Sequence, residues 1–399
     1  MTTSPERCLG SLIKDIDEEI SPNEIDFVSK DETTCRTSSE FKLSLDSIYS
    51  FNSNSSFFSP LSGDNKFSQT NNYSNLSYTK SSILSAFTNQ RSTIILQKSL
   101  MEISKDTIDL IIKEMSGTFS ENIKNKNGNY FCSDLFKVCD TNQRITILEE
   151  IKNTLCDDCI DEYGTHPIQN LVELASSEEE YKLILFSFKD YNKILNASLN
   201  PNGSYVIQKI IVHIPEQLRL DFNAILIKYL SVLAMDMYGV CTVKKFIGYT
   251  KNELHKKQIL NIILTNFISI SENQYGNYLI QYILEYWWDS KEGLFLKKIC
   301  ISKFHILALN HFSSYICDLF IKLSSVEDKE ILMSSLIKNN TIALLNNNHG
   351  NFIKNKLMNS LNFQKEGNNS KKVHIPLSLN NIRTFHSKNR KETEQSKQK

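Results

Sequence analysis

The stretch NQYGNYLIQ, residues 273–281, recurs in related form along most of this 399-residue chain. Eight nine-residue copies stand in register, and they begin at Asn89, Asn125, Asp161, Asn200, Asp236, Asn273, Asn310 and Asn347. Successive copies start 36, 36, 39, 36, 37, 37 and 37 residues apart. A steady period in this range is typical of a solenoid, in which each repeat buries its apolar face by stacking on its neighbours.

Apolar residues within and after each copy follow a helical period. In the fourth repeat the apolar stripe consists of Val206, Ile207, Ile210, Ile211 and Ile214, and the sixth repeat matches it with Leu279, Ile280, Ile283 and Leu284. Pro215 ends the first of these segments. The run DFNAILIKYLSVL, residues 221–233, predicts a second apolar helix. We therefore expect an all-α solenoid with at least two helices per repeat.

The start of each copy has the composition of a turn. Its first residue is Asn or Asp, which satisfies free backbone groups at turns and helix starts. Its fourth residue is always small: Ser92, Gly128, Gly164, Gly203, Gly239, Gly276, Ser313 and Gly350. Six of the twelve glycines in the chain therefore share one register, which predicts a close backbone approach that a larger side chain would block.

Three further positions share one side of the repeated helix, because they are spaced i, i+1 and i+4. The fifth residues are Thr93, Asn129, Thr165, Ser204, Val240, Asn277, Ser314 and Asn351. The ninth residues are Gln97, Ser133, Gln169, Gln208, Lys244, Gln281, Asp318 and Asn355. The sixth residues are Ile94, Tyr130, His166, Tyr205, Cys241, Tyr278, Tyr315 and Phe352, of which six are flat rings.

A ring flanked by two small hydrogen-bonding groups, once per repeat, suits a flexible single strand of nucleic acid. Rings stack on bases for about 1–3 kcal/mol each, and amides, hydroxyls and carboxylates meet base edges. The alternative is ordinary structure, since Asn and Ser are common at helix starts and Tyr is often half-buried. Packing needs alone do not explain rings and polar flanks in eight registered copies, so the pattern favours the base-binding reading.

With NYLIQ at 277–281, SYVIQ at 204–208 and THPIQ at 165–169, the chain resembles the PUF (Pumilio-like) family of single-stranded RNA-binding proteins. The resemblance covers residues 81–364. It implies a right-handed superhelical crescent of eight repeats whose concave face binds RNA, with one base per repeat. It also implies antiparallel binding, in which the last repeat meets the 5′ base.

The resemblance assigns bases to pairs of fifth and ninth residues. Asn277 with Gln281 resembles a uracil reader, and Ser314 with Asp318 resembles a guanine reader in which Asp replaces the usual Glu. Three pairs resemble adenine readers: Thr93 with Gln97, Thr165 with Gln169, and Ser204 with Gln208. Asn351 with Asn355 resembles a weakened uracil reader, because Asn is shorter than Gln. The stacking rings would be Tyr130, His166, Tyr205, Tyr278, Tyr315 and Phe352.

Three repeats depart from the family pattern. Ser133 replaces Gln beside Asn129 in the second repeat, so the expectation of uracil there rests on Asn129 alone. Val240 and Lys244 replace the usual small polar residue and Gln in the fifth repeat. This repeat is therefore expected either to recognise no particular base or to accept any base that offers a hydrogen-bond acceptor. Ile94 replaces a stacking group in the first, whose base would be held loosely. The expected target lies near 5′-UGUNAAUA-3′.

The two ends of the chain differ from the repeats. Residues 1–80 form a Ser/Asn-rich arm with 7 basic and 12 acidic side chains and no helical or strand period, so we expect disorder. Residues 365–399 form a basic tail with 9 basic and 3 acidic side chains, also expected to be disordered. The Pumilio homology domain between them, residues 81–364, is nearly neutral with 29 basic and 30 acidic side chains.

The resemblance implies post-transcriptional regulation through messenger RNA 3′ untranslated regions, by translational repression or mRNA decay. We expect a cytoplasmic monomer that binds single-stranded RNA and works with deadenylase or translational-repressor proteins. No secretory signal, membrane span, catalytic motif, cofactor or metal is expected. Cys156 and Cys159, with Cys132 and Cys139 upstream, have zinc-like spacing, but small core cysteines are the favoured reading.

Two other functions remain open at this level. A nucleolar Pumilio-like protein would bind structured RNA during ribosome biogenesis, and it would show degraded base readers and basic patches. A HEAT- or armadillo-like scaffold would bind peptides, and it would lack the ring flanked by base-reading groups. Five intact or near-intact pairs and the neutral repeats favour reading of a single strand.

Overall fold

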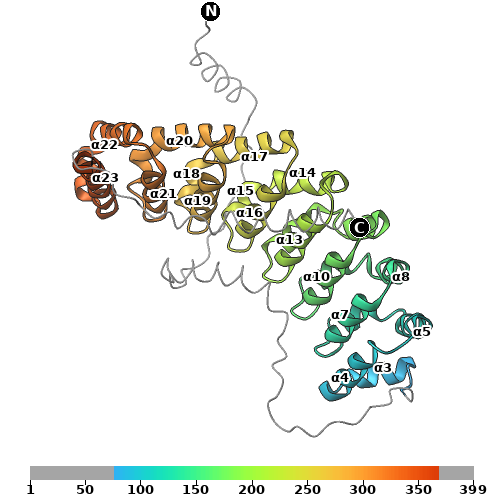
Figure 1. The fold of residues 1–399 in the computed structure, drawn as a ribbon. Helices are drawn as coiled ribbons and strands as arrows, with labels where there is room; N and C mark the ends of the chain where they lie inside the picture. The colour runs from blue at the N-terminus through green and yellow to red at the C-terminus, as the bar shows by residue number, and fades with distance from the viewer. Residues whose placement is uncertain (1–75, 368–399) are drawn as a thin grey trace, which may run out of the picture. The chain divides into compact units, whose positions relative to one another are not determined.

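The computed structural model describes residues 76–367, in which all regular secondary structure is helical (Figure 1). The predicted all-α solenoid is therefore confirmed. The repeated nine-residue pattern initiates one helix in every repeat. These helices are α4 (Gln90–Ser99), α7 (Gly128–Val138), α10 (Thr165–Leu174), α13 (Gly203–His213), α16 (Gly239–Tyr249), α19 (Gly276–Trp287), α21 (His311–Leu323) and α23 (Asn348–Gly367).

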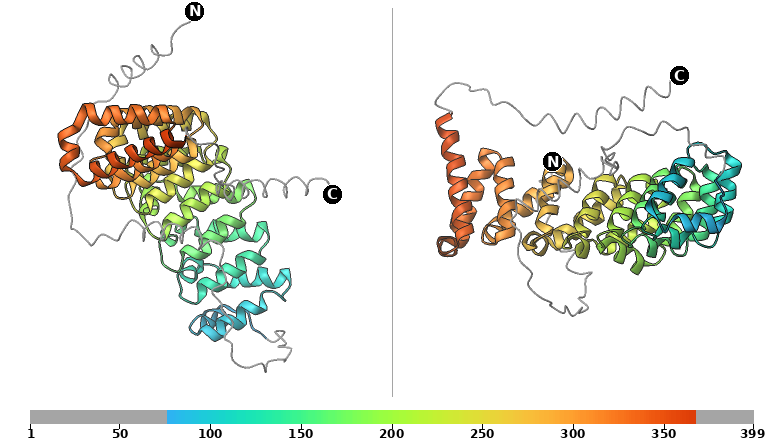
Figure 2. Two further views of the ribbon diagram at one scale, coloured as in Figure 1. Left: turned by 60° about the vertical axis from the view of Figure 1, so that its left-hand side comes forward. Right: turned by 90° about the horizontal axis from the view of Figure 1, so that it is seen from below.

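A second row of helices follows the first. It consists of α5 (Lys105–Met115), α8 (Thr141–Ile151), α11 (Glu178–Ser187), α14 (Leu220–Lys228), α17 (Glu253–Thr265), α20 (Lys291–Leu307) and α22 (Val326–Asn346). Figure 1 shows that the row of repeats curves and that the pattern-bearing helices occupy its concave side, so we call them the inner helices and the second row the outer helices. Neighbouring inner helices contact one another along the row, and the turned views show the same order (Figure 2).

Short helices precede the first six inner helices, and all of them but the first connect an outer helix to the next inner helix. They are α3 (Lys80–Ala86), α6 (Phe119–Ile123), α9 (Leu155–Asp158), α12 (Tyr191–Leu199), α15 (Leu230–Ala234) and α18 (Phe267–Glu272), with a 3-10 turn η3 (Glu216–Leu218) before α14. Most repeats thus contain three helices. Near the C-terminal end, the long helices α20 and α22 continue directly to the turn before the next inner helix.

The run at 221–233 is not one helix, which corrects the sequence-based expectation. It divides at Tyr229, whose backbone has φ −102° and ψ 12°, into α14 and α15. The Tyr229 amide still donates to the Ile225 carbonyl at 3.1 Å, so the chain bends without leaving that group unpaired. The bend lets Leu230 and Leu233, both fully buried, face α16.

The apolar stripes form the core between the two rows. Val206, Ile207, Ile210, Ile211 and Ile214 are all buried, and so are Leu279, Ile280, Ile283 and Leu284. Both predicted stripes are confirmed. Each repeat buries its stripe against adjacent inner and outer helices, so neighbouring repeats stabilise one another.

The turn chemistry also agrees with the sequence. Asn273 accepts hydrogen bonds through Oδ1 from the amides of Tyr275 (2.8 Å) and Gly276 (2.9 Å), and the first residue of every other copy accepts from one or two amides in the same way. A Cβ on Gly276 would lie 2.3 Å from the Ile270 carbonyl oxygen. The fourth residue is therefore small because the short helix presents a carbonyl to it.

One buried ion pair joins consecutive outer helices. Arg144 on α8 donates from Nε to Glu180 Oε1 on α11 at 2.7 Å, and both side chains are buried. Glu180 Oε2 also accepts from the backbone amides of Ser176 and Ser177, each at 2.9 Å. Every partner of this carboxylate is thus fixed by the fold, which ties the second repeat to the third.

The predicted disordered ends fall mostly outside the described residues, which leave out 1–75 and 368–399. At the described margins, α3 begins at Lys80, and α23 continues to Gly367, beyond the expected end of the repeats at 364. Within residues 76–367, no helix has both the length and the apolar character required to span a membrane.

Candidate nucleic-acid interface

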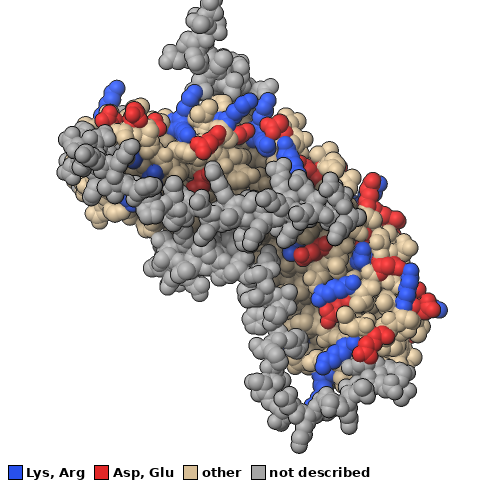
Figure 3. Space-filling view, in the orientation of Figure 1, with Lys and Arg blue, Asp and Glu red and all other residues tan. Residues whose placement is uncertain are grey.

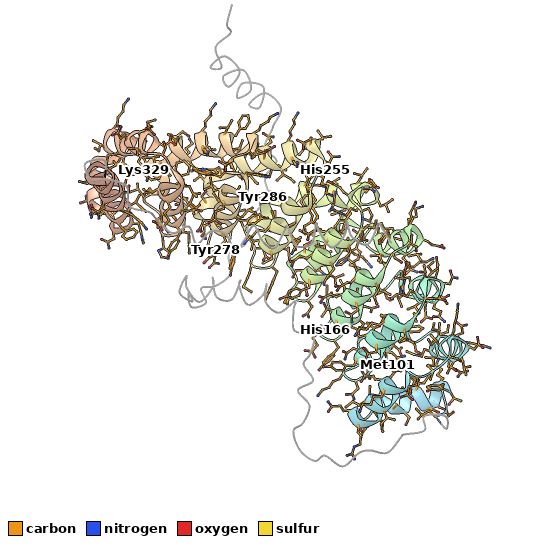
Figure 4. All side chains as sticks on the ribbon, in the orientation of Figure 1. Met101, His166, His255, Tyr278, Tyr286 and Lys329 are labelled. Atoms are coloured by element: carbon orange, nitrogen blue, oxygen red, sulfur yellow. The ribbon has the colours of Figure 1, made fainter. Side chains whose placement is uncertain are left out.

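The sixth residues of the copies present their rings on the inner helices. Tyr130 is 51% exposed and Phe352 is 59% exposed, whereas Tyr205, Tyr278 and Tyr315 are partly exposed. Figure 4 shows His166 and Tyr278 along the inner margin of the curved row. Burial lowers the pKa of His166, so its ring is neutral at pH 7 and suited to stacking. The predicted ring positions therefore share one accessible surface.

Two sixth residues leave this surface without a ring. Ile94 is partly exposed in the first repeat, and Cys241 is only 7% exposed in the fifth. Burial raises the pKa of the Cys241 thiol, which keeps it protonated at neutral pH. The fifth repeat thus offers neither a ring nor a reactive thiol to a ligand.

Seven of the eight fifth residues, all but Asn351, are more buried than their predicted role suggests. Asn277 is 1% exposed, and its Nδ2 donates to the carbonyls of Asn273 (3.0 Å) and Gln274 (2.9 Å). Asn129 makes the equivalent bonds, while Ser314 Oγ donates to the His311 carbonyl at 2.7 Å. Each side chain therefore helps to close its turn, and only its remaining acceptor capacity can face a ligand.

Fifth and ninth residues are joined directly in two repeats. Gln281 Nε2 donates to Asn277 Oδ1 at 3.0 Å, and Gln169 Nε2 donates to Thr165 Oγ1 at 3.0 Å. The structure therefore brings these two predicted reader pairs together. Most other ninth residues are likewise partly or fully accessible, namely Gln97, Gln208, Lys244, Asp318 and Asn355, whereas Ser133 is 8% exposed.

The fifth repeat differs in its geometry as well as its sequence. Val240 is fully buried, and the Lys244 ammonium lies 5.1 Å from the centre of the Tyr282 ring. A cation held over an aromatic face gains about 0.5–1 kcal/mol at an exposed site. Tyr282 is also stacked on Tyr286 with ring centres 5.5 Å apart. Lys244 thus contacts a ring of the sixth repeat.

Asp318 of the seventh repeat lies between two lysines. Lys322 Nζ contacts Oδ2 at 2.8 Å, and Lys356 Nζ contacts Oδ1. Burial alone would raise the pKa of Asp318, but the hydrogen bonds from Lys322 and Lys356 outweigh it and hold the pKa below its ordinary value. The side chain is therefore a carboxylate at neutral pH and accepts hydrogen bonds without donating any.

A contact that the sequence did not predict recurs between repeats. The ninth residue of one repeat meets the tenth residue of the next at three places: Gln97 with Asp134 (Nε2 to Oδ2, 2.6 Å), Lys244 with Tyr282, and Asp318 with Lys356. The tenth residue follows the ring by four positions, so it lies on the same helical side. That spacing places the tenth residue on the ring side of its helix, but the distance to the neighbouring helix decides whether it meets the ninth residue there.

Charges on the accessible surface are mixed. On the face shown in Figure 3, basic and acidic side chains alternate along the described repeats. Between the third and fourth inner helices, Lys209 pairs with Glu173 at 2.8 Å. The third and fourth inner helices are thus joined by a pair of opposite charges.

The cysteines with zinc-like spacing are core residues. Cys132, Cys139, Cys156 and Cys159 are all buried, and burial raises the pKa of the Cys139 thiol to about 12. Cys159 Sγ donates to the Cys156 carbonyl at 3.0 Å, as expected for a thiol that closes a turn. Residues 76–367 contain no group of three or more side chains arranged to hold a metal ion.

Known proteins share this sequence pattern. A profile for the Pumilio-family RNA binding repeat matches residues 123–152, 193–220, 230–264 and 266–287. Pumilio homolog 12 of Arabidopsis thaliana is 29% identical over 221 residues, which cover 54% of this chain and 36% of that protein. A Pumilio domain-containing protein of Schizosaccharomyces pombe is 25% identical over 288 residues, which cover 72% of this chain and 42% of that protein.

Solved structures share the fold. The Puf4 RNA binding domain, bound to an HO endonuclease RNA 3′ UTR recognition sequence, has a TM-score of 0.63 at 20% identity, and the match covers 70% of this chain and 87% of that domain. The RNA-binding domain of yeast Puf5p, bound to SMX2 RNA, has a TM-score of 0.61 at 21% identity, with 72% and 85% covered.

These matches agree with the registered pattern and with the helical repeats. The aligned regions account for only 36% and 42% of the two relatives' lengths. The repeat matches, the Pumilio relatives and the Puf structures together support placing this chain in the Pumilio (PUF) repeat family.

Proposed function

We propose that this chain binds single-stranded RNA in a sequence-specific manner along its inner helices, with one base per repeat. The observation that carries the proposal is the sixth repeat, where the joined amides of Asn277 and Gln281 lie next to the partly exposed Tyr278 ring. A base stacked on this ring would bring its hydrogen-bonding edge to the two amides. Rings recur at the same position in five other repeats.

The proposed target remains close to 5′-UGUNAAUA-3′, with the first three bases facing the eighth, seventh and sixth repeats in that order. The fourth base faces the fifth repeat, where buried Val240 and ring-bound Lys244 support an unread position. Related structures support the general mode of binding, because Puf4 and Puf5p RNA-binding domains were solved with RNA.

We further propose that the bound RNAs are messenger RNAs recognised in their 3′ untranslated regions, in the cytoplasm. The Puf4 structure contains such a 3′ UTR sequence, which supports this class of target. Repression of translation or mRNA decay would then follow from recruitment of repressor or deadenylase proteins by a monomeric chain. No catalytic step is assigned to the chain itself.

The test is fluorescence anisotropy of the full chain with labelled UGUAAAUA and with ACAAAAUA at one near-physiological salt concentration. Salt must be constant because the phosphate contribution to binding varies with it. Preference for the UGU strand, by about 1–3 kcal/mol per changed base, supports the proposal. Equal binding to both strands would favour the nucleolar alternative, and no binding to either would favour a peptide scaffold.

A further inference from the structure

Asp318 and Lys356 form a composite hydrogen-bonding group from two consecutive inner helices. Asp318 is the ninth residue of its repeat on α21, and Lys356 is the tenth residue of the next repeat on α23. The Lys356 ammonium contacts Asp318 Oδ1 and also lies 5.6 Å from the centre of the Phe352 ring. The ammonium is therefore positioned beside both the carboxylate and a ring proposed to stack on RNA.

The two lysines at Asp318 differ in their surroundings. Lys322 is 60% exposed and comes from the same helix as Asp318, four residues further on. Lys356 is 34% exposed and crosses from the neighbouring repeat. A base stacked against Tyr315 and Phe352, the sixth residues of the two repeats, would meet the carboxylate together with the ammonium that crosses between them. Lys356 is thus the lysine placed to contact that base.

We propose that Lys356 is a specificity-determining residue of the seventh repeat, which donates to guanine O6 while Asp318 accepts from guanine N1–H and the 2-amino group. This inference rests on the proposed RNA binding and extends it to a residue outside the fifth, sixth and ninth positions. A carboxylate has about four lone-pair positions and an ammonium has three N–H groups, so both ions can keep their mutual contact and still bind the base.

The order of groups along each base edge explains the selectivity. Guanine presents an acceptor at position 6 followed by two donors, which complements an ammonium followed by a carboxylate. Adenine presents a donor and then an acceptor, which places like groups against both ions. Cytosine likewise presents a donor to the ammonium and an acceptor to the carboxylate. Uracil presents its acceptor O2 to the carboxylate. The pair therefore favours guanine over all three other bases.

The composite group also accounts for the short acidic side chain. Asp318 has one methylene fewer than the Glu of the family pattern, so it holds the base with less reach. Lys356 adds a donor on a long, flexible stem from the next repeat. The recurring contact between ninth and tenth residues of consecutive repeats, as in Gln97 with Asp134, shows that this register is built into the fold.

The experiment compares Lys356→Met with Lys322→Met in the full chain. Both changes remove one ammonium from Asp318 and keep most of the aliphatic stem. Anisotropy is measured with UGUAAAUA and UAUAAAUA at constant salt. We expect Lys356→Met to reduce the guanine-over-adenine affinity ratio about tenfold, in line with the loss of one base-edge contact. Lys322→Met should change the two affinities alike and leave their ratio near that of the wild type.

A modified base identifies the contacted atom. Replacing the guanine by 6-thioguanine weakens the acceptor at position 6. This replacement should therefore reduce the RNA affinity of the wild type, and it should reduce the RNA affinity of Lys356→Met by a smaller factor. Replacing the guanine by inosine, which lacks the 2-amino group, should reduce the RNA affinity of both proteins by the same factor, because that group faces Asp318.

The outcomes separate this inference from the proposed function. An unchanged or increased guanine-over-adenine ratio in Lys356→Met would overturn the role of Lys356, and it would mean that the lysine only neutralises Asp318. Equal loss of the ratio in both lysine variants would overturn it as well. If the wild-type chain shows no preference for UGUAAAUA over UAUAAAUA, guanine recognition by the seventh repeat itself fails.

Discussion

Gln281 Nε2 donates to Asn277 Oδ1 at 3.0 Å, so the two amides of the sixth repeat are joined before any ligand binds. Asn277 is held further by two turn carbonyls, which fix its side-chain orientation. Groups held in place before binding lose less conformational entropy when a ligand arrives. The sixth repeat is therefore a preorganised part of the proposed interface, and it is a natural site for direct tests.

Tyr278 supplies the ring next to these amides. Replacing Tyr278 by Ala removes a stacking face and should weaken binding of UGUAAAUA by about 1–3 kcal/mol. Tyr286→Ala is the matched control, because Tyr286 lies on the same helix, is 51% exposed and lies outside the sixth-residue register. Fluorescence anisotropy measures both variants. A loss in Tyr286→Ala as large as that in Tyr278→Ala would argue against stacking at the sixth position.

The fifth repeat should gain base discrimination when its missing groups are restored. Val240→Ser combined with Lys244→Gln recreates the pair present in the fourth repeat, where Ser204 lies in the same turn and donates to the Pro201 carbonyl at 3.4 Å. We expect the variant to prefer adenine at the fourth base of the target by about 1–3 kcal/mol. The wild type should bind all four bases there with similar affinity. Similar affinities of the variant for all four bases at that position would contradict the assignment of residues 240 and 244 to base recognition.

The Arg144–Glu180 pair should govern stability without affecting RNA affinity. Arg144→Ala leaves the buried carboxylate without its cation, and the free energy of unfolding should fall by about 3–5 kcal/mol. Lys182→Ala is the control, because the pair of Lys182 with Glu178 is largely exposed and such pairs contribute little. Urea denaturation measures the difference. Similar losses in the two variants would mean that the buried pair is not a stabilising link.

The same pair sets a pH dependence. Although burial would raise the pKa of Glu180, hydrogen bonds from Ser176, Arg144 and Ser177 lower it below the ordinary value of a glutamate. Its contribution to stability is therefore fully present above the unfolded pKa, near 4.3, and is lost as pH falls through the folded pKa. Glu180→Gln should flatten this acid branch of the stability curve. If stability falls as steeply at acidic pH in Glu180→Gln as in the wild type, other carboxylates cause that loss.

The close approach at the start of the inner helices predicts an asymmetry between two glycines. Gly276→Ala places a Cβ 2.3 Å from the Ile270 carbonyl oxygen and should destabilise the fold by about 1–3 kcal/mol. Gly248→Ala is more easily accommodated, because its Cβ meets only the Tyr282 hydroxyl at 3.1 Å and Ala favours the helix. The midpoint of thermal unfolding is measured for both variants. Equal midpoints for Gly276→Ala and Gly248→Ala would contradict the steric reason for glycine at the fourth position.

Much of this architecture could be predicted from local sequence. The period, the stripe from Val206 to Ile214 and the Asn or Asp that begins each copy act within one repeat, so each leaves a periodic signal. The close approach at Gly276 was also predictable, because only a very small residue fits there in most copies. Local rules were therefore sufficient for the inner helices.

Features that depend on contacts between repeats were not predictable. The apolar run at 221–233 gives no sign of the bend at Tyr229, because burial of Leu230 and Leu233 under α16 decides it. The burial of the fifth residues and the contact of Asp318 with Lys356 likewise depend on how far one inner helix lies from the next. The spacing of residues along one helix does not determine that separation.

Exchange of a single reader pair tests the central claim of one base per repeat most directly. Asn277→Ser combined with Gln281→Glu gives the sixth repeat the guanine pair of the family pattern, and affinities for UGUAAAUA and UGGAAAUA are measured by fluorescence anisotropy. The account predicts that the variant prefers guanine at the third base, while preferences at the other bases stay as in the wild type. A variant that still prefers uracil there, or that loses discrimination at all bases together, would contradict reading by individual repeats.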